Sequence, residues 1–188
     1  MICYLKPIEE KYLTTILEWR NSLRIRRAMF TEDIISMDEH KKWFETVNLK
    51  SDFSIFLFFC DQMPLGVMSF NQTSYVNAFT FWGFYIGTQS SKGFGKILGY
   101  LGLEYAFNQL KLNKVYGEVL TGNEKSIKFH ESFGFNQEGY FKNHINKQGE
   151  FCDVIRYALF NEEWRHKRKD FLELFTSKGI QIHSSFEI

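Results

Sequence analysis

Cysteine is scarce in this chain, and proline is scarcer still. The 188 residues include two prolines and three cysteines, at positions Cys3, Cys60 and Cys152. The cysteines are odd in number and widely spaced, and they form neither a Cys-x-x-Cys pair nor a cluster with histidines, which argues against a zinc site. We therefore expect three free thiols in a reducing compartment, no disulfide framework and no metal.

Long apolar runs and an excess of charge are also absent. No apolar run approaches the roughly 18 residues of a membrane-spanning helix, and the segment from Met1 to Pro7 lacks the apolar region of a signal peptide. The formal net charge of +1 gives no general attraction to nucleic acid or to an anionic membrane. These features predict a soluble cytoplasmic protein with neither kind of partner.

The residues that are plentiful are apolar and aromatic. Hydrophobic residues make up 44% of the chain, with 21 Phe and 9 Tyr. A chain of this length and composition is expected to form one domain with a large, strongly aromatic core.

The chain is organised around a strand, a glycine turn and a helix between Phe79 and Leu110. Aromatic and β-branched residues predict a strand from Phe79 to Ile86, and the spacing of apolar residues predicts a helix that begins at or near Gly93. Gly93 and Gly95 allow the backbone to approach an anion closely, and the unpaired N–H groups of the first helical turn point at it. Such a turn is typical of a loop that holds a pyrophosphate.

Two better-known nucleotide motifs do not fit this Gly-x-Gly pair. A dinucleotide fingerprint requires a third glycine where the chain has Leu98, and a P-loop requires Ser or Thr where Ile97 follows Lys96. A tight turn without a ligand remains the plainest alternative to a different pyrophosphate loop.

A second stretch of chemical interest runs from Asn123 to Phe135. Ile127 and His130 lie three residues apart, which predicts a short helix that ends at Gly134. This stretch follows the predicted strand from Val115 to Leu120 and comes after the glycine turn in the sequence.

Together, the two stretches resemble the GNAT superfamily of N-acetyltransferases. The first is similar to its acetyl-CoA loop, Gln/Arg-x-x-Gly-x-Gly/Ala, with Ser90 at the Gln/Arg position; the second is similar to Asn-x-x-Ser/Ala-x-x-Leu/Phe-Tyr-x-x-x-Gly-Phe, with His130 at the tyrosine. The resemblance implies an α/β fold, with a mixed, mostly antiparallel sheet of about seven strands that splays between the fourth and fifth and is flanked by helices. The acetyltransferase domain is expected over residues 1–160. Residues 161–188 are expected to form an added C-terminal helix and a tail that is mobile from Thr176.

The same resemblance implies acetyl-CoA as co-substrate. Backbone donors of the loop would bind the pyrophosphate, while the splayed strands would pair with pantetheine and stabilise the oxyanion at the thioester carbonyl. The residues expected at this site are Tyr85, Ile86, Lys92, Gly93, Phe94, Gly95, Lys96, Asn123 and Ser126.

The acceptor pocket is expected to be lined by Arg20, Asn21 and His40, which fall on the two helices that cover the splayed strands in this fold. A guanidinium suits a phosphate or a carboxylate. His40 is equally well explained as a partly buried histidine near the start of the helix that Ser36 and Glu39 predict as a capping box.

Two residues are candidates for proton transfer during direct acetyl transfer. Glu118, on the predicted strand from Val115 to Leu120, is a candidate base for the attacking amine, and an ion pair with a surface lysine explains it equally well. His130 is expected to protonate the departing CoA thiolate, because an unperturbed histidine has a pKa of about 6.5. The alternative for His130 is a plain hydrogen-bonding residue at a helix surface.

Within the superfamily, Trp19–Asn21 and Trp82–Ile86 are most similar to the N-acetyltransferases of pseudaminic acid biosynthesis, which serves flagellin glycosylation. This likeness implies transfer of acetyl to the 4-amino group of a UDP-4-amino-4,6-dideoxy-N-acetylhexosamine, the beta-L-altrosamine derivative, by a monomer or a homodimer. Two alternatives stay open: an acetyltransferase of protein N-termini or ribosomal proteins, and a GNAT-fold module that binds CoA without catalysis. Composition and spacing alone indicate only an acetyl-CoA-dependent transferase.

Overall fold

The computed structural model describes residues 1–89 and 93–183. Its strands are β1 (Ile2–Pro7), β2 (Ser54–Cys60), β3 (Met63–Ser74), β4 (Phe79–Ile86), β5 (Lys114–Leu120), β6 (Asn136–Lys147), β7 (Glu150–Phe160) and β8 (Gln181–Ile182). Its helices are α1 (Leu13–Asn21), α2 (Leu23–Arg26), α3 (Met37–Asn48), α4 (Phe94–Glu104), α5 (Glu124–Phe133) and α6 (Asn161–Ser177). A 3₁₀ turn, η1 (Glu10–Tyr12), precedes α1, and a π-helical turn, η2 (Tyr105–Gln109), continues α4.

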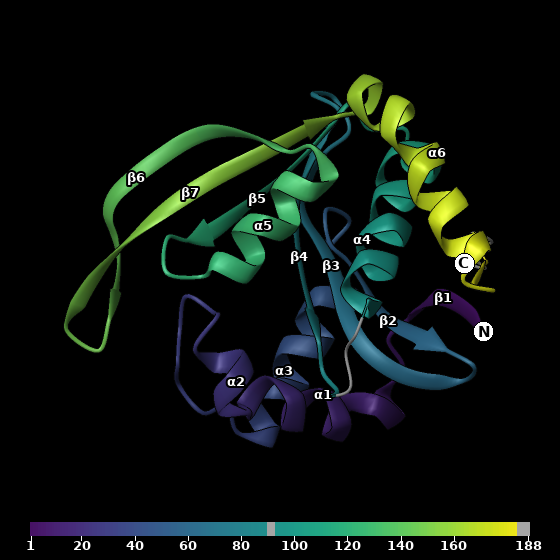
Figure 1. The fold of residues 1–188 in the computed structure, drawn as a ribbon. Helices are drawn as coiled ribbons and strands as arrows, with labels where there is room; N and C mark the ends of the chain where they lie inside the picture. The colour runs from purple at the N-terminus through teal and green to yellow at the C-terminus, as the bar shows by residue number, and fades with distance from the viewer. Residues whose placement is uncertain (90–92, 184–188) are drawn as a thin grey trace.

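Among the described residues, eight strands form one mixed sheet in the order β6-β7-β5-β4-β3-β2-β1-β8 (Figure 1). The β4–β5 and β1–β8 pairs are parallel and the other pairs are antiparallel. The expected α/β fold with a mostly antiparallel sheet is therefore confirmed. The eighth strand arises because β8, which the sequence did not predict, adds to the edge of β1.

Two apolar cores lie on opposite faces of this sheet. Successive residues of a strand point to opposite faces, so Phe58 of β2 joins the core under α4, α5 and α6, whereas Leu57 joins the core under α1. Figure 1 shows α4 and α6 along one flank of the sheet and α1, α2 and α3 gathered at another. No helix in the described part of the chain is long and apolar enough to cross a bilayer.

The start of α3 confirms the predicted capping box. The Ser36 hydroxyl accepts a hydrogen bond from the Glu39 N–H, and the Glu39 carboxylate accepts one from the Ser36 N–H. These two bonds satisfy donors that the first turn of a helix leaves unpaired. They therefore fix the residue at which α3 begins.

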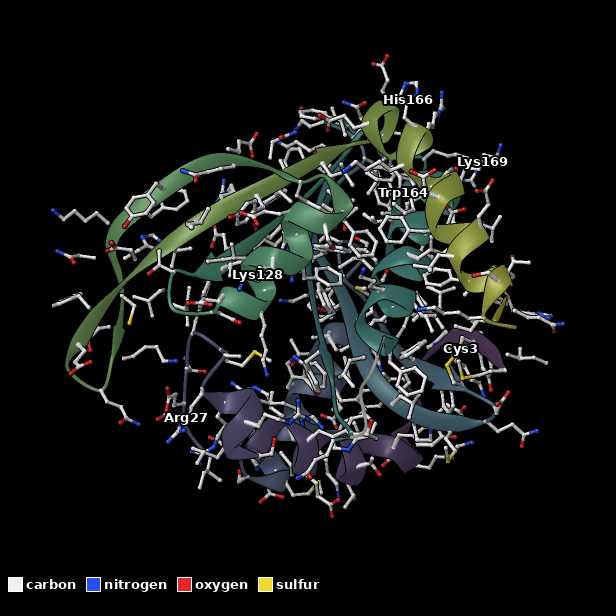
Figure 2. The ribbon with its side chains drawn as sticks, viewed as in Figure 1. Cys3, Arg27, Lys128, Trp164, His166 and Lys169 are labelled. Carbon is white, nitrogen blue, oxygen red and sulfur yellow. A yellow bond between two sulfur atoms is a disulfide. The ribbon has the colours of Figure 1, made fainter. Side chains whose placement is uncertain are left out.

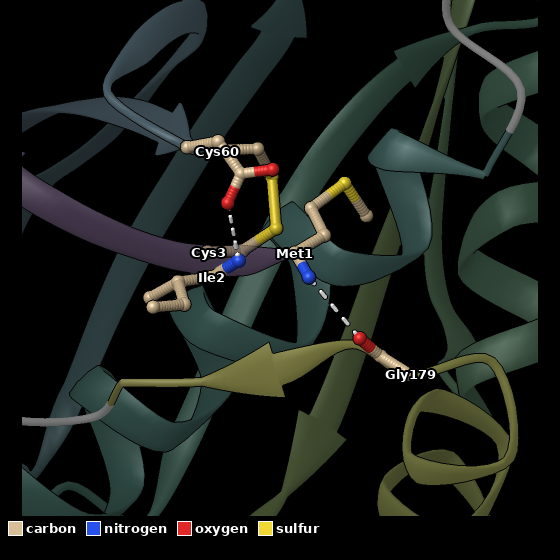
Figure 3. Close-up of a disulfide and its surroundings, with 6 residues drawn as sticks. Met1, Ile2, Cys3, Cys60 and Gly179 are labelled. Atoms are coloured by element: carbon tan, nitrogen blue, oxygen red, sulfur yellow. Dashed lines mark hydrogen bonds between the residues drawn. A yellow bond between two sulfur atoms is a disulfide. The ribbon is translucent and has the colours of Figure 1, made fainter.

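Cys3 and Cys60 form a disulfide, which corrects the expectation of three free thiols (Figure 3). The two residues face each other in the register of β1 and β2, with their Cα atoms 4.2 Å apart. The pairing depends on strand register between segments 57 residues apart, so no local spacing reveals it. Cys152 is free and half-buried, and the cysteines no longer support a reducing compartment.

The C-terminal segment returns to the N-terminus. In β8, Gln181 pairs with Ile2, and the amino group of Met1 donates to the Gly179 carbonyl at 3.2 Å (Figure 3). The expectation of a mobile tail from Thr176 is therefore wrong as far as Ile182. Backbone pairing with β1 holds this segment, and the sequence of the tail itself gives no strong strand pattern.

Candidate active site

β4 runs alongside β5 only at its beginning. The last residues paired between them are Phe81 and Tyr116, whereas on its other side β4 stays paired with β3 as far as Ile86. Within residues 1–89 and 93–183, the second half of β4 therefore has no strand partner on its β5 side. The splay expected between the fourth and fifth strands is confirmed, and it leaves backbone groups at the end of β4 without a strand partner on that side.

Ile86 presents its backbone to this gap. The Gly87 N–H donates to the Leu65 carbonyl at 2.8 Å, on the β3 side, and successive residues of a strand direct their backbone groups to opposite edges. The N–H and C=O of Ile86 therefore point toward β5. The Tyr85 ring packs in the core under α1, where burial raises the pKa of its phenol, so Tyr85 stays protonated.

The N-terminus of α4 has the geometry expected of an anion-binding turn. Gly93 precedes the helix with φ at 89°, in the left-handed region that glycine adopts without strain, and no side chain of the described residues caps the first turn. A Cβ on Gly95 would meet no described atom within 4 Å. Because no side chain of the described residues caps these first N–H groups, the turn can accept a phosphate. Lys92, expected at the same site, lies outside the described residues.

The other two expected loop residues, Phe94 and Lys96, differ in how exposed their side chains are. The Phe94 ring packs near Phe58, with ring centroids 6.2 Å apart, and Lys96 is exposed. At this turn, the group of Phe94 that could bind an anion is its backbone N–H, and that of Lys96 is its charged side chain.

Asn123 and Ser126 form the start of α5. Asn123 Oδ1 accepts from the Ser126 N–H at 3.2 Å, which makes Asn123 the N-cap of the helix. The helix ends at Gly134, as predicted, with φ at 86°. Contacts of Asn123 and Ser126 with acetyl-CoA stay a prediction.

His130, on α5, is buried among aromatic rings, with 3% of its surface exposed. Its Nδ1 lies 2.7 Å from the Ser126 carbonyl oxygen, and the indole N–H of Trp82 points at its Nε2 across 3.3 Å. Because an indole only donates, Nε2 accepts and the proton sits on Nδ1. The ring of Tyr157 stacks on the imidazole with centroids 5.4 Å apart.

These surroundings correct the expectation that His130 titrates near neutral pH. Burial lowers the pKa of His130 to about 4, against the smaller opposing effect of its hydrogen bond to Ser126. The ring is therefore neutral at pH 7, and both of its nitrogens are engaged. The lowered pKa and the two engaged nitrogens argue against His130 as the acid that protonates the CoA thiolate, a role that stays a prediction. His130 also does not lie at the helix surface, as the alternative had it.

Glu118 forms an ion pair, with Arg156 in place of the expected lysine. The Arg156 Nε donates to the Glu118 carboxylate at 3.0 Å, and Nη2 makes a second, shorter contact. The guanidinium also lies 5.0 Å from the centroid of the Tyr116 ring. A role of Glu118 as base stays a prediction. Within the described residues, no three His, Cys, Asp or Glu side chains are grouped so that they could hold a metal ion.

Arg20 is only partly paired within the fold. Its Nη2 donates to the hydroxyl and the carbonyl of Thr31 at 3.1 and 3.3 Å. Its Nη1 is buried without a partner among the described residues. Burial lowers the pKa of the guanidinium, and the nearby Tyr85 opposes that effect. A buried cationic donor left unpaired is costly unless a ligand supplies the acceptor.

Asn21 and His40 are more strongly tied to the fold. The Asn21 side chain donates to the Ile35 carbonyl at 2.8 Å and accepts from the Ile35 N–H at 2.9 Å, so its amide holds the segment before α3. His40 stacks on Trp43 with centroids 5.0 Å apart, and burial lowers its pKa. Its Nε2 has no partner in the described part of the chain, and a substrate contact there stays a prediction.

The tip of the β6–β7 hairpin closes onto the segment between α2 and α3, which the sequence did not predict. Lys147 donates to the backbone carbonyls of Arg27 and Met29 at 2.9 and 3.0 Å and forms an ion pair with Glu32 at 2.8 Å. Lys147 and Arg27 are 120 residues apart in the chain. No local pattern signals this contact, because it depends on the curvature of the hairpin seen in Figure 1.

Comparison with known proteins places these features in a wider group. The sequence profile of the acetyltransferase (GNAT) domain matches residues 5–155. Acetyltransferase PseH from Campylobacter jejuni is 30% identical over 129 residues, which cover 68% of this chain and 79% of that protein. Spermidine N(1)-acetyltransferase from Escherichia coli is 23% identical over 166 residues, which cover 88% of this chain and 89% of that protein.

A solved structure of a spermidine N-acetyltransferase from Vibrio cholerae, in complex with CoA and spermine, has the same fold. Its TM-score is 0.82 at 23% sequence identity, over 87% of this chain and 98% of that chain. At this level of identity the likeness concerns the fold alone.

Proposed function

Because the chain belongs to the GNAT acetyltransferase family and is an acetyl-CoA-dependent N-acetyltransferase, we propose that its acceptor is an anionic nucleotide sugar. The proposed reaction transfers acetyl to the 4-amino group of a UDP-4-amino-4,6-dideoxy-N-acetylhexosamine. The sequence resemblance to the acetyltransferases of pseudaminic acid biosynthesis favours this acceptor. Relatives of comparable similarity are named for spermidine, which is a cation, so the charges of the acceptor side distinguish the two.

The observation that carries the proposal is a buried guanidinium nitrogen of Arg20, Nη1, that has no partner among the described residues. Glu32 is paired with Lys147, and Glu118 is paired with Arg156. A diphosphate needs free cationic donors, whereas a polyamine needs free carboxylates. The free nitrogen of Arg20 therefore favours an anionic acceptor, while Asp33, which acts on Arg20 electrostatically, is the carboxylate that a polyamine would use.

In this proposal, acetyl-CoA supplies the acetyl group and the chain positions it. The open first turn of α4, at Gly93 and Gly95, binds the pyrophosphate through backbone N–H groups. The Ile86 N–H, which faces the gap, donates to the thioester carbonyl as negative charge develops there. The attacking amine must be neutral, and its proton leaves through Glu118 or through a chain of waters.

A panel of acceptors tests the proposal. Each of a UDP-4-amino sugar, spermidine and a peptide with a free N-terminus is incubated with enzyme and acetyl-CoA, and release of the CoA thiol is measured. We expect kcat/KM to be highest for the UDP-sugar. Preference for spermidine would overturn the proposed acceptor but not the acetyltransferase activity. Absence of thiol release with every acceptor would favour the non-catalytic alternative.

Replacing Arg20 tests the site of anion recognition. Arg20→Gln should raise KM for the UDP-sugar about tenfold or more, because a hydrogen bond to a charged group contributes about 1.5–3 kcal/mol. KM for acetyl-CoA should change less than about twofold, a split that marks an acceptor contact. Arg27→Gln is the matched control, since Arg27 is exposed at the outer edge of the α2 region (Figure 2). Equal damage to both KM values would show that the pocket assignment is wrong.

A further inference from the structure

Arg24, at the start of α2, reaches the end of β4. Its Nη2 donates to the Ile86 carbonyl at 2.9 Å and to the Gly87 carbonyl at 2.8 Å. Hydrogen bonds from a guanidinium to two successive carbonyls are charge-assisted and fix the direction of the peptide between them. The peptide that joins Ile86 to Gly87 is thus held at its oxygen by Arg24 and at its N–H by Leu65.

Trp19, at the end of α1, presses on the same peptide from another side. A Cβ built on Gly87 would lie only 2.0 Å from the Trp19 ring, so no side chain fits between them. The carbonyl of Trp19 in turn accepts from the Ser22 N–H at 3.1 Å and from the Ser22 hydroxyl at 2.7 Å. These two hydrogen bonds connect the end of α1 to Ser22, the residue before α2. They therefore hold Trp19 and Arg24 in a fixed relative position.

The Ile86 carbonyl needs such a partner because of where it points. It faces the gap beside β5 together with the Ile86 N–H, and no strand of the described residues pairs with it there. An unpaired carbonyl oxygen beside a thioester would repel the negative charge that develops during acetyl transfer. Arg24 removes that repulsion by binding the carbonyl, and it brings a positive charge to the same place.

We propose that Arg24 is a positioning residue for acetyl transfer, which acts with Trp19 to hold the Ile86–Gly87 peptide so that the Ile86 N–H faces the thioester carbonyl. The inference rests on the acetyl-CoA site proposed above and is independent of the acceptor. Arg24 contacts backbone at the end of the catalytic gap and does not itself react. Its effect is on the polarisation of the thioester carbonyl and not on the affinity for the nucleotide part of the coenzyme.

The carbonyl of bound acetyl-CoA reports on this arrangement directly. Infrared difference spectra of acetyl-CoA labelled with ¹³C at the acetyl carbonyl should show a stretch at lower frequency with the wild-type protein than in water. Arg24→Gln should lose most of that shift, Arg24→Lys should keep part of it, and Arg27→Gln should keep all of it. Affinity for CoA, which has no acetyl carbonyl, should change less than about threefold in all three variants.

Turnover with an accepted amine gives the second readout. Removal of an oxyanion donor costs about 10²–10³ in kcat, and a misdirected donor should cost about tenfold in Arg24→Gln. Gly87→Ala should lose the infrared shift with Arg24 intact, because its methyl group would displace the peptide from Trp19. Gly139→Ala is its control, since a Cβ there meets nothing closer than 3.5 Å.

An unchanged carbonyl shift in Arg24→Gln would overturn the proposal. So would a loss of CoA affinity and thermal stability in step with the shift, because that pattern marks a purely structural role. If the wild-type protein does not bind acetyl-CoA, the proposed acetyl-CoA site is wrong and so is this proposal. Failure of the UDP-sugar as acceptor changes none of these spectra, so the two failures are distinguishable.

Discussion

His130 shows how burial changes what a histidine can do. In the folded protein its pKa is lowered to about 4, whereas in the unfolded chain it returns to the ordinary value of 6.5. Between these two values the unfolded state holds the proton more tightly, so protonation favours unfolding. The contribution of His130 to the free energy of unfolding is complete above pH 6.5 and is lost as the pH falls toward 4.

This linkage predicts a measurable difference between His130→Gln and the wild type. The wild type should lose about 3 kcal/mol of unfolding free energy from this group alone between pH 7 and pH 4, since one pKa unit corresponds to about 1.4 kcal/mol. His130→Gln should be less stable at pH 7 and should lose less on acidification. Urea unfolding at several pH values measures both effects.

His166→Gln is the matched control, because His166 is exposed on α6 and its side chain lies at the outside of the molecule (Figure 2). It removes an exposed histidine and supplies the unfolding curves with which those of His130→Gln are compared. Parallel curves for His130→Gln and the wild type would contradict the lowered pKa. They would also reopen the role of His130 as a proton donor.

The sequence located His130 correctly but could not give its chemistry. Its place on α5, four residues before Gly134, follows from local spacing. The neighbours that set its pKa, Trp82 and Tyr157, come from β4 and β7. Glu118 is a similar case, because its partner Arg156 is set by the register of β5 and β7. Side-chain identity is local information, whereas protonation depends on contacts between distant segments.

At the scale of elements, the first turn of α4 predicts two opposite effects of one substitution. Gly95→Ala should raise stability by up to about 1 kcal/mol, because alanine favours helix over glycine and its methyl group meets no described atom within 4 Å. The same methyl group would stand where a phosphate approaches the backbone, so affinity for acetyl-CoA should fall about tenfold or more. Thermal unfolding measures the change in stability, and calorimetric titration measures the change in affinity for acetyl-CoA.

Lys92→Ala provides the comparison for this turn. If backbone donors hold the pyrophosphate, removal of the Lys92 charge should weaken acetyl-CoA binding less than Gly95→Ala does. Gly93→Ala should weaken binding as well, but it should lower stability, because φ at 89° strains any residue with a Cβ. A larger loss in Lys92→Ala than in Gly95→Ala would mean that the lysine charge holds the phosphate.

Elements whose signals are local were predictable, and those that depend on distant partners were not. The Ser36 capping box and the Gly134 helix end are each fixed within a few residues and were confirmed. The four-residue helix α2 was missed, because Leu23–Arg26 is too short for a helical pattern to show. The strand β8 was missed because two residues become a strand only beside β1.

At the scale of the whole molecule, the two ends of the chain are joined at one edge of the sheet. The Cys3–Cys60 disulfide links β1 to β2, and β8 adds to the other side of β1. A disulfide that closes a loop of this size restricts the unfolded chain and contributes roughly 4 kcal/mol in the chain-entropy model. We expect reductant to lower the free energy of unfolding by an amount of that order.

Urea unfolding of the Cys152→Ala variant, with and without reductant, measures this effect without interference from the free thiol. Thiol titration of the unfolded wild-type chain should find one reactive group before reduction and three after it, since Cys152 is the cysteine outside the disulfide. Three reactive thiols without reductant would show that the pair is not oxidised in the purified protein. Cys3→Ala with Cys60→Ala should match the reduced form, apart from the loss of buried sulfur contacts.

The docking of α6 on α4 depends on a buried carboxylate, Glu104, with 5% of its surface exposed. Glu104 accepts from the Trp164 indole N–H at 2.8 Å, from Asn108 at 2.9 Å and from the Arg168 Nε at 3.0 Å. Figure 2 shows the Trp164 side chain directed from α6 toward α4, while Lys169 points away from it. One carboxylate accepts hydrogen bonds from three donors. Its loss should therefore weaken the packing of α4 against α6.

Glu104→Gln should therefore lower the free energy of unfolding by about 2 kcal/mol, since hydrogen bonds to a charged group are worth about 1.5–3 kcal/mol and the half-exposed Arg168 can be rehydrated. KM for acetyl-CoA should stay within about twofold. Glu104 ends the helix whose first turn is the proposed coenzyme site, and it lies roughly 15 Å from that turn at 1.5 Å per residue. Glu173→Gln is the control: its pair with Lys169 is exposed and should contribute less than about 1 kcal/mol. If the two variants lose equal stability, the buried carboxylate does not hold α6 in place. If Glu104→Gln instead raises KM for acetyl-CoA, α6 supports the coenzyme site through α4 and belongs to the catalytic unit.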